Sequence, residues 1–253
     1  MPSLSIPVRT VPAVPFPNVS YGPFKLLEAI PWLLFASVMR VVAYGNPTLA
    51  IVALPASQMA IFLAFLLAAR RMIEFADGST GLGGLDFRAQ LSLAGAILRR
   101  VVVILVGGAV CAASMGQSAL APQLLWGFDG IAFDQSSDAG RVWSSALAGL
   151  VLLMVVQVGL GRAVALSGAL RELGRRFWYV VPAMLVVALM QIGLSPVQGA
   201  TRNLVRIYYF STSHPLPLKS GVFFVYVFGF AAVRLWISLA ILVFVLRASY
   251  RRL

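Results

Sequence analysis

The sequence has 253 residues, of which 60% are hydrophobic and only 11% are charged. Soluble domains carry about 25% charged residues, so this composition excludes an ordinary soluble protein and indicates a chain whose main solvent is lipid. The net charge of +12 comes from 20 basic and 8 acidic residues. In a membrane protein we expect such an excess in the cytoplasmic loops, and we therefore predict a lipid bilayer and no nucleic acid as its partner.

Cys111 and His214 are the only residues of their types. A single cysteine excludes an intrachain disulfide and a thiolate cluster for zinc or iron–sulfur. A single histidine excludes paired-histidine haem ligation and multi-histidine metal sites. We accordingly predict no cofactor and no metal centre.

The N-terminal segment is rich in proline, with six prolines in residues 1–24. Such spacing favours extended chain over helix. A signal peptide needs a continuous apolar stretch after a basic start, and this segment has none, so we expect it to be retained. The predicted domains are a flexible tail at residues 1–24 and a single transmembrane domain at residues 25–253.

Six apolar segments approach or exceed the roughly 20 residues that a spanning helix needs. They are residues 30–44, 48–69, 101–121, 143–166, 177–194 and 221–246. The turn Asn46-Pro47 joins the first two into a helical hairpin, and Ser195-Pro196 closes the fifth. The predicted fold is an all-α integral membrane protein, a bundle of about six transmembrane helices.

The basic residues are unequally distributed between the connecting segments. Fourteen of the 20 lie at the N-terminus, between spans two and three, between spans four and five, or after span six, against four on the other side. The positive-inside rule then places both termini in the cytoplasm. The two remaining cations, Arg40 and Arg234, lie inside predicted spans.

Two connecting segments have helical periodicity of their own. After a glycine-rich loop, Asp86 is a plausible N-cap, and apolar residues from Phe87 to Leu98 recur on one helical face. We predict a cytoplasmic interfacial helix at residues 85–98 that leads into the third span. Residues 200–210 predict a second, short interfacial helix on the outer side.

Arg234 lies 13 residues from Gly221 and 12 from Leu246, at mid-membrane. A charge at this depth costs about 3 kcal/mol or more and requires acceptors. None of the eight acids lies inside a predicted span, and we expect Asp129, Asp134 and Asp138 to lie in a solvated outer loop. Glutamines at the depth of Arg234 or closer to the outer face are its predicted partners. The candidate ligand-binding residues are Arg234, Arg40, Gln58, Gln157, Gln117 and Gln191.

Three interpretations of Arg234 and Arg40 are open. In the first interpretation, both arginines are structural and bind backbone carbonyls and glutamines between helices. Alternatively, they bind an anion, such as a lipid head group, phosphate or an organic acid. The third interpretation is that a membrane partner subunit supplies the missing carboxylate.

Residues 116–119 read GQSA, which is similar to the glycine–x–serine pattern of rhomboid intramembrane proteases. The resemblance covers four residues, Ser118 being the serine of the pattern, and that family also has a six-helix core. In that family the histidine lies inside the last helix, whereas His214 precedes the last predicted span here. An intramembrane enzyme is therefore the weakest of the functions considered.

The sequence predicts a non-enzymatic, multi-pass protein of the bacterial cytoplasmic membrane. We expect it to be a permease-like protein or transport-system subunit that handles an anionic solute or lipid. The alternative is a scaffold or assembly subunit of a larger membrane complex.

Overall fold

The computed structural model describes residues 17–19, 22–75, 87–159, 164–211 and 213–251. Six helices in these ranges are long and apolar enough to cross a membrane, which confirms the prediction of a multi-pass, predominantly helical membrane protein. They are α1 (Ile30–Gly45), α2 (Pro47–Met72), α3 (Phe87–Ser114), α5 (Asp138–Gly159), α7 (Phe177–Ser211) and α8 (Leu216–Arg251). Residues 1–16 of the predicted tail, the glycine-rich loop with Asp86, and Arg162 lie outside the described ranges.

Shorter elements connect these helices. Strand β1 (Pro17–Val19) pairs antiparallel with β2 (Ile73–Phe75), and Pro17 lies opposite Phe75. The 3₁₀ helix η1 (Pro23–Ala29) leads into α1, and α6 (Leu166–Arg175) precedes α7. The short helix α4 (Ala121–Leu125) and the 3₁₀ helix η3 (Gly127–Ile131) link α3 to α5. The end of the proline-rich segment is therefore paired in a small sheet, which its composition did not indicate.

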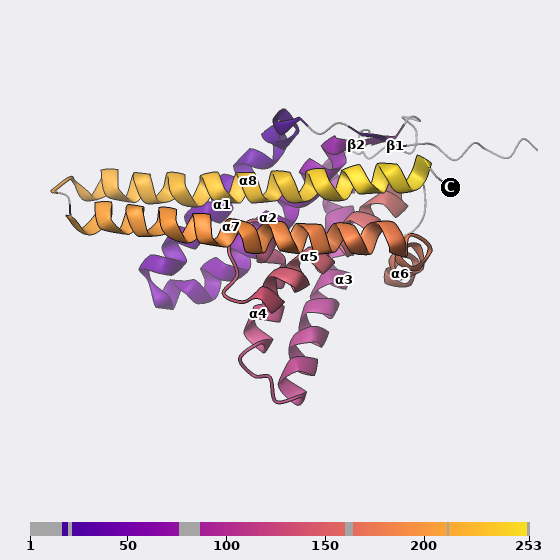
Figure 1. Cartoon of the computed structure of the whole chain (residues 1–253), viewed down its shortest axis with the longest axis horizontal. Helices are drawn as coiled ribbons and strands as arrows, with labels where there is room; N and C mark the ends of the chain where they lie inside the picture. The colour runs from indigo at the N-terminus through magenta and orange to yellow at the C-terminus, as the bar shows by residue number, and fades with distance from the viewer. Residues whose placement is uncertain (1–16, 20–21, 76–86, 160–163, 212, 252–253) are drawn as a thin grey trace, which may run out of the picture.

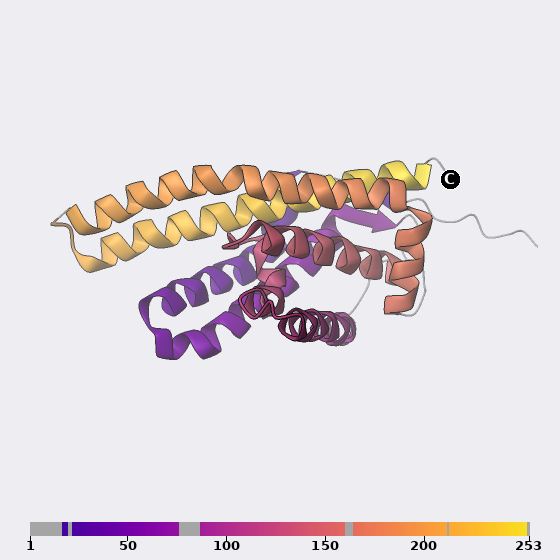
Figure 2. The same ribbon diagram turned by 60° about the horizontal axis from the view of Figure 1, so that its bottom comes forward.

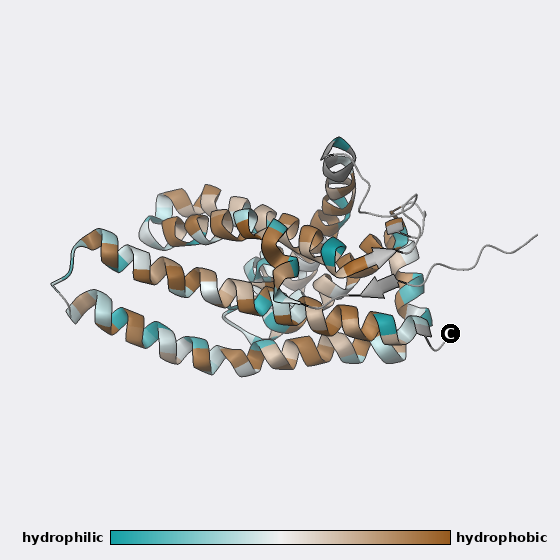
Figure 3. Cartoon of the chain, turned by 90° about the horizontal axis from the view of Figure 1, so that it is seen from above, coloured by the Kyte–Doolittle hydropathy of each residue, from teal (hydrophilic) through white to brown (hydrophobic). Residues whose placement is uncertain are grey.

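Helices α7 and α8 lie side by side and form the long axis of the molecule (Figure 1). We call their connection at residues 211–216 the loop end, and the opposite end, where α8 finishes at Arg251, the terminal end. The α1–α2 hairpin and α5 pack against this pair (Figure 2). Hydrophobic residues cover most of the length of these helices, as Figure 3 shows by colour.

The α1–α2 hairpin has the predicted turn. The side chain of Asn46 accepts hydrogen bonds from the backbone N–H groups of Thr48 at 3.0 Å and Leu49 at 3.3 Å. These groups are unpaired donors at the start of α2, and an asparagine cap satisfies two of them. Pro47 occupies the first turn, where its missing N–H costs nothing.

Helix α3 differs from the other long helices in direction. It runs downward from the α7–α8 pair in Figure 1 and appears nearly end-on in Figure 2, so it lies across that pair. It is also the least buried of the six. The predicted interfacial helix and third span form this one continuous helix from Phe87. Its position at the cytoplasmic interface stays a prediction.

Helix α3 ends before the predicted boundary at Ala121. Gly116 has a φ of +77°, a conformation that glycine adopts without strain. The N–H of Gln117 reaches back to the carbonyl of Ala112 at 2.9 Å, and that of Gly116 bonds Ala113 at 3.1 Å. This pattern of hydrogen bonds is a Schellman-type end, which glycine favours.

The predicted end of the fifth span at Ser195-Pro196 is wrong. Helix α7 continues through Pro196 to Ser211, so the predicted short helix at residues 200–210 is its last part. A proline removes one backbone hydrogen bond and need not end a helix that is supported by packing. Here α8 packs along α7 and supplies that support. The fourth span is displaced from its predicted range, because α5 begins at Asp138, and Val164 and Ala165 are not helical.

Arg176 joins three helices at the terminal end. It pairs with Glu172 of α6 at 3.3 Å and donates to the carbonyl of Ser249 on α8 at 3.0 Å. Its guanidinium also lies 3.6 Å from the ring centroid of Tyr250, a cation–π contact. These contacts fix the end of α8 against α6 and the start of α7.

Candidate functional site

The segment between α3 and α5 folds back between the long helices. All five residues of η3 are buried. Phe128 packs edge-to-face against Phe62 and Phe65 of α2, with each pair of ring centroids 5.5 Å apart. Burial of these three rings holds η3 in the interior, because aromatic side chains contribute large apolar areas.

This segment brings Asp129 to Arg40. A carboxylate oxygen of Asp129 lies 2.9 Å from a guanidinium nitrogen of Arg40, with the two side chains 1% and 13% exposed. The hydroxyl of Ser57 lies 3.5 Å from the other oxygen. Burial raises the pKa of Asp129 to about 6, while Arg40 and the hydroxyl of Ser57 lower it. Desolvation is thus only partly offset by the ion pair.

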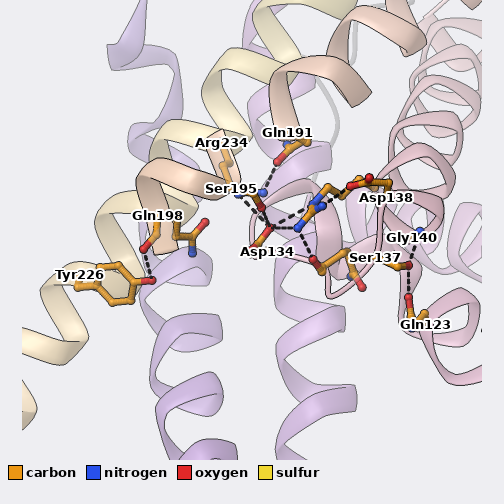
Figure 4. Close-up of polar contacts among 12 residues, drawn as sticks. Gln123, Asp134, Ser137, Asp138, Gly140, Gln191, Ser195, Gln198, Tyr226 and Arg234 are labelled. Carbon is orange, nitrogen blue, oxygen red and sulfur yellow. Dashed lines mark hydrogen bonds and ion pairs between the residues drawn. The ribbon is translucent and has the colours of Figure 1, made fainter. Parts of the chain in front are cut away.

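Asp134 meets Arg234, the mid-helix cation of α8. The Oδ1 atom of Asp134 lies 3.1 Å from Nη2 of Arg234, whose side chain is fully buried. Arg234 also donates to Oε1 of Gln191 on α7. The amide nitrogen of Gln191 donates to Ser238 at 3.0 Å and to the carbonyl of Ile131 at 3.3 Å. Figure 4 shows Asp134, Gln191 and Arg234 where these side chains meet.

The same oxygen of Asp134 accepts hydrogen bonds from side chains of two further helices. It accepts from Arg141 of α5 at 3.2 Å and from the hydroxyl of Ser195 of α7 (Figure 4). Arg141 in turn pairs with Asp138 and donates to the carbonyl of Gln135 at 2.7 Å. One carboxylate therefore connects α5, α7 and α8 at a single point.

The prediction of a solvated outer loop is wrong for Asp129 and Asp134. The side chain of Asp129 is buried and that of Asp134 is 34% exposed, and the two carboxylates neutralise Arg40 and Arg234, the cations that lacked an acid within the spans. Only Asp138 keeps a mostly exposed side chain, at 68%. The sequence contained a signal for this, because Phe128, Ile131 and Phe133 alternate with the acids and would be poorly placed in a solvated loop.

Of the four glutamines predicted as ligand-binding candidates, the structure places only Gln191 against Arg234. Gln191 contacts Arg234, as described above. Gln58 donates to the carbonyl of Leu125 at 3.3 Å, and Gln117 is exposed in the turn after α3. Gln157 is buried near Gly168 of α6. It lies 16 residues beyond Arg141 on α5, or about 24 Å at 1.5 Å per residue, so its predicted depth beside Arg234 is wrong.

A cavity of about 470 Å³ lies beside these ion pairs, between α1, α7, α8 and the segment before α5. Its polar and charged lining includes Arg40, Asp134, Gln198 and Tyr226. The hydroxyl of Tyr226 donates to the carbonyl of Gln198 at 3.3 Å (Figure 4). Ligand sites commonly have such a volume and a few convergent polar groups.

Arg202 of α7 also lines this cavity, and it forms no ion pair with any residue that the structure describes. Nε of Arg40 is buried and has no hydrogen-bond partner within the described ranges. Asp129 and Asp134 are already engaged by Arg40, Arg141 and Arg234. The cavity lining therefore has a net positive charge, and the charge of Arg202 is not neutralised by a described carboxylate, which is an environment suited to an anion.

The residues of the rhomboid-like pattern are not brought together. Ser118 lies in the turn after α3, whereas His214 lies at the loop end with its ring 5.7 Å from that of Tyr208. The two regions are apart in Figures 1 and 2. No protein-family model matches the chain, and no curated protein or solved structure is detectably similar to it.

Proposed function

We propose that this multi-pass membrane protein binds an anionic group in the cavity between α1, α7 and α8, as a permease-like protein or transport-system subunit of the bacterial cytoplasmic membrane. The observation that carries the proposal is the position of Arg202. It faces a cavity whose carboxylates are already paired, and it has no acidic partner among the described residues.

The internal ion pairs define the role of the two mid-helix arginines. Arg234 is fully buried, its two terminal nitrogens bind Asp134 and Gln191, and it does not line the cavity, so in this proposal it is structural. Arg40 pairs with Asp129 and also lines the cavity. It therefore combines a structural ion pair with a donor for the ligand. Positively charged side chains are the usual lining of anion sites in membranes.

The test is the binding of inorganic phosphate and sulfate to the purified protein in nanodiscs of neutral lipid, measured by calorimetry. Arg202→Gln should weaken binding at least about tenfold, the loss expected for one charge-assisted hydrogen bond. Arg99→Gln removes the same charge from an exposed position on α3 and should leave binding unchanged. Equal binding by wild type and both variants would refute the proposal.

The alternative function, a scaffold or assembly subunit, is favoured by one feature. Helix α3 crosses the other helices and exposes Val102, Val103, Val106 and Val110 along one side. A partner helix could cover this side as well as lipid does. Purification from native membranes with identification of stoichiometric partners distinguishes the two, because a scaffold should retain a partner and a binding protein should not require one.

A further inference from the structure

A second cavity, of about 410 Å³, adjoins the anion site towards the loop end. Three residues line both cavities: Tyr44, Arg202 and Phe223. The rings of Tyr44 and Phe223 contact edge-to-face with centroids 6.2 Å apart. The two cavities are therefore neighbours around Arg202.

The walls of the second cavity differ from those of the first. Val41 of α1 and Val205, Tyr209 and Phe210 of α7 supply an apolar and aromatic lining. Its charged lining residues are Arg202 and Arg206, and no carboxylate is among the described residues that form it. The two arginines are one helical turn apart, and such a like-charged pair is mildly unfavourable until an anion neutralises it.

We infer that the ligand is an amphiphilic anion, with its charged group between Arg40 and Arg202 and its apolar part in the second cavity. This inference rests on the proposed anion site and names the class of its ligand. A small inorganic anion would leave the second cavity unused, whereas an uncharged apolar molecule would leave Arg202 without an anionic partner. The volumes of the two cavities lie in the range usual for sites that hold small organic molecules.

The experiment compares inorganic phosphate, butyl phosphate and octyl phosphate on the protein in nanodiscs of neutral lipid. Empty nanodiscs give the background due to partitioning. Octyl phosphate should bind about 100-fold more tightly than inorganic phosphate, as expected when roughly four methylene groups leave water. Equal affinities would overturn the inference. If none of the three compounds binds, both the inference and the proposed anion site are overturned.

Val205→Trp tests the position of the apolar part. The larger side chain fills the second cavity, so octyl phosphate should lose its advantage while inorganic phosphate binds as before. Leu204→Trp is the matched control, because Leu204 is the neighbouring residue, is 67% exposed and lines neither cavity. An advantage that survives Val205→Trp would overturn the inference. If that variant does not fold, Ser220→Trp fills the same cavity from α8.

An amphiphilic anion can come from the bilayer or from water, and competition separates these sources. Phosphatidic acid in the nanodisc should displace octyl phosphate if the ligand is a lipid. Undiminished binding of octyl phosphate would identify a water-borne organic anion. Both results support an amphiphilic ligand. In either case, a loss of octyl phosphate binding in Arg202→Gln shows that the binding measured is at the proposed site.

Discussion

Asp134 and Arg234 lie 100 residues apart in the chain, and their side chains meet at 3.1 Å. Arg234 is fully buried, so this carboxylate compensates a charge that would otherwise be costly within the membrane. The contact also fixes the segment before α5 against α8. The arginine and the aspartate thus act together, although one comes from an apolar helix and the other from a connecting segment.

We expect Asp134→Asn to destabilise the protein by about 3 kcal/mol, because it leaves a buried guanidinium without its counter-charge. Thermal unfolding in detergent measures the change. Asp138→Asn is the control, since Asp138 is 68% exposed and contacts the same Arg141. Its loss should cost about 1 kcal/mol or less, as is usual for exposed ion pairs. Equal effects of the two substitutions would show that Arg234 does not depend on Asp134.

Arg234→Gln should cost less than Asp134→Asn. Without Arg234, the carboxylate of Asp134 still accepts from Arg141 and Ser195, so no charge is left unpaired. Arg234→Lys keeps the charge but loses the planar group that reaches Asp134 and Gln191 together. The double variant Asp134→Asn, Arg234→Gln should be more stable than Asp134→Asn alone, which a double-mutant cycle measures. Additive losses would contradict the pairing.

The long helices could be predicted from the sequence because their hydropathy is a local property. Six apolar segments became six long helices, and the turn at Asn46 joins the first two as predicted. The ends were less accurate, since Pro196 is tolerated inside α7 by packing against α8. The crosswise direction of α3 is a property of tertiary packing and has no signal in the periodicity of its own residues.

The candidate site was predicted only in part. Arg40, Arg234 and Gln191 were identified because polar residues are rare inside apolar segments. Their acids were missed, since Asp129 and Asp134 lie in a segment whose mean hydropathy resembles that of a loop. The aromatic contacts of Phe128 with α2, together with the burial of Ile131 and Phe133, explain why this segment enters the interior. Arg202 was assigned to an outer interfacial helix, and its place in the cavity follows from the continuation of α7.

Asp129 should make the stability of the protein depend on pH. Burial raises its pKa from 3.8 to about 6, so the folded protein holds a proton at pH values where the unfolded chain has lost it. Its protonation therefore contributes stability that is present below about pH 4 and lost as the pH rises through about 6. Melting curves between pH 4 and 7 should show this fall for wild type, relative to Asp129→Asn. Parallel curves for the two proteins would contradict it.

Gly127→Ala should destabilise the segment that carries both aspartates. A Cβ atom at Gly127 would lie 2.2 Å from Cδ1 of Trp143, and the indole cannot yield freely because its N–H donates to the carbonyl of Leu124 at 3.0 Å. Overpacking of this kind costs about 1–3 kcal/mol. Gly95→Ala is the control, since a Cβ there meets nothing within 4 Å. A melting temperature unchanged by Gly127→Ala would show that η3 tolerates displacement.

The predicted orientation places the terminal end in the cytoplasm, because 14 basic residues flank the spans on that side and four on the other. Reporter fusions after Arg71, Arg176 and Arg251 should report cytoplasm, and fusions after Gly116 and Ser213 the outside. Asp134 is unsuitable as a fusion point because its side chain joins three helices. Labelling of an introduced cysteine at Ser213 by an impermeant thiol reagent gives an independent measurement, with Cys111→Ala as background. If the cysteine at Ser213 is protected from the reagent and the fusion after Arg251 reports the periplasm, the orientation is the reverse of the predicted one. It would also place the cavity that contains Arg202 towards the cytoplasm, so that an anion from water would reach it from inside the cell.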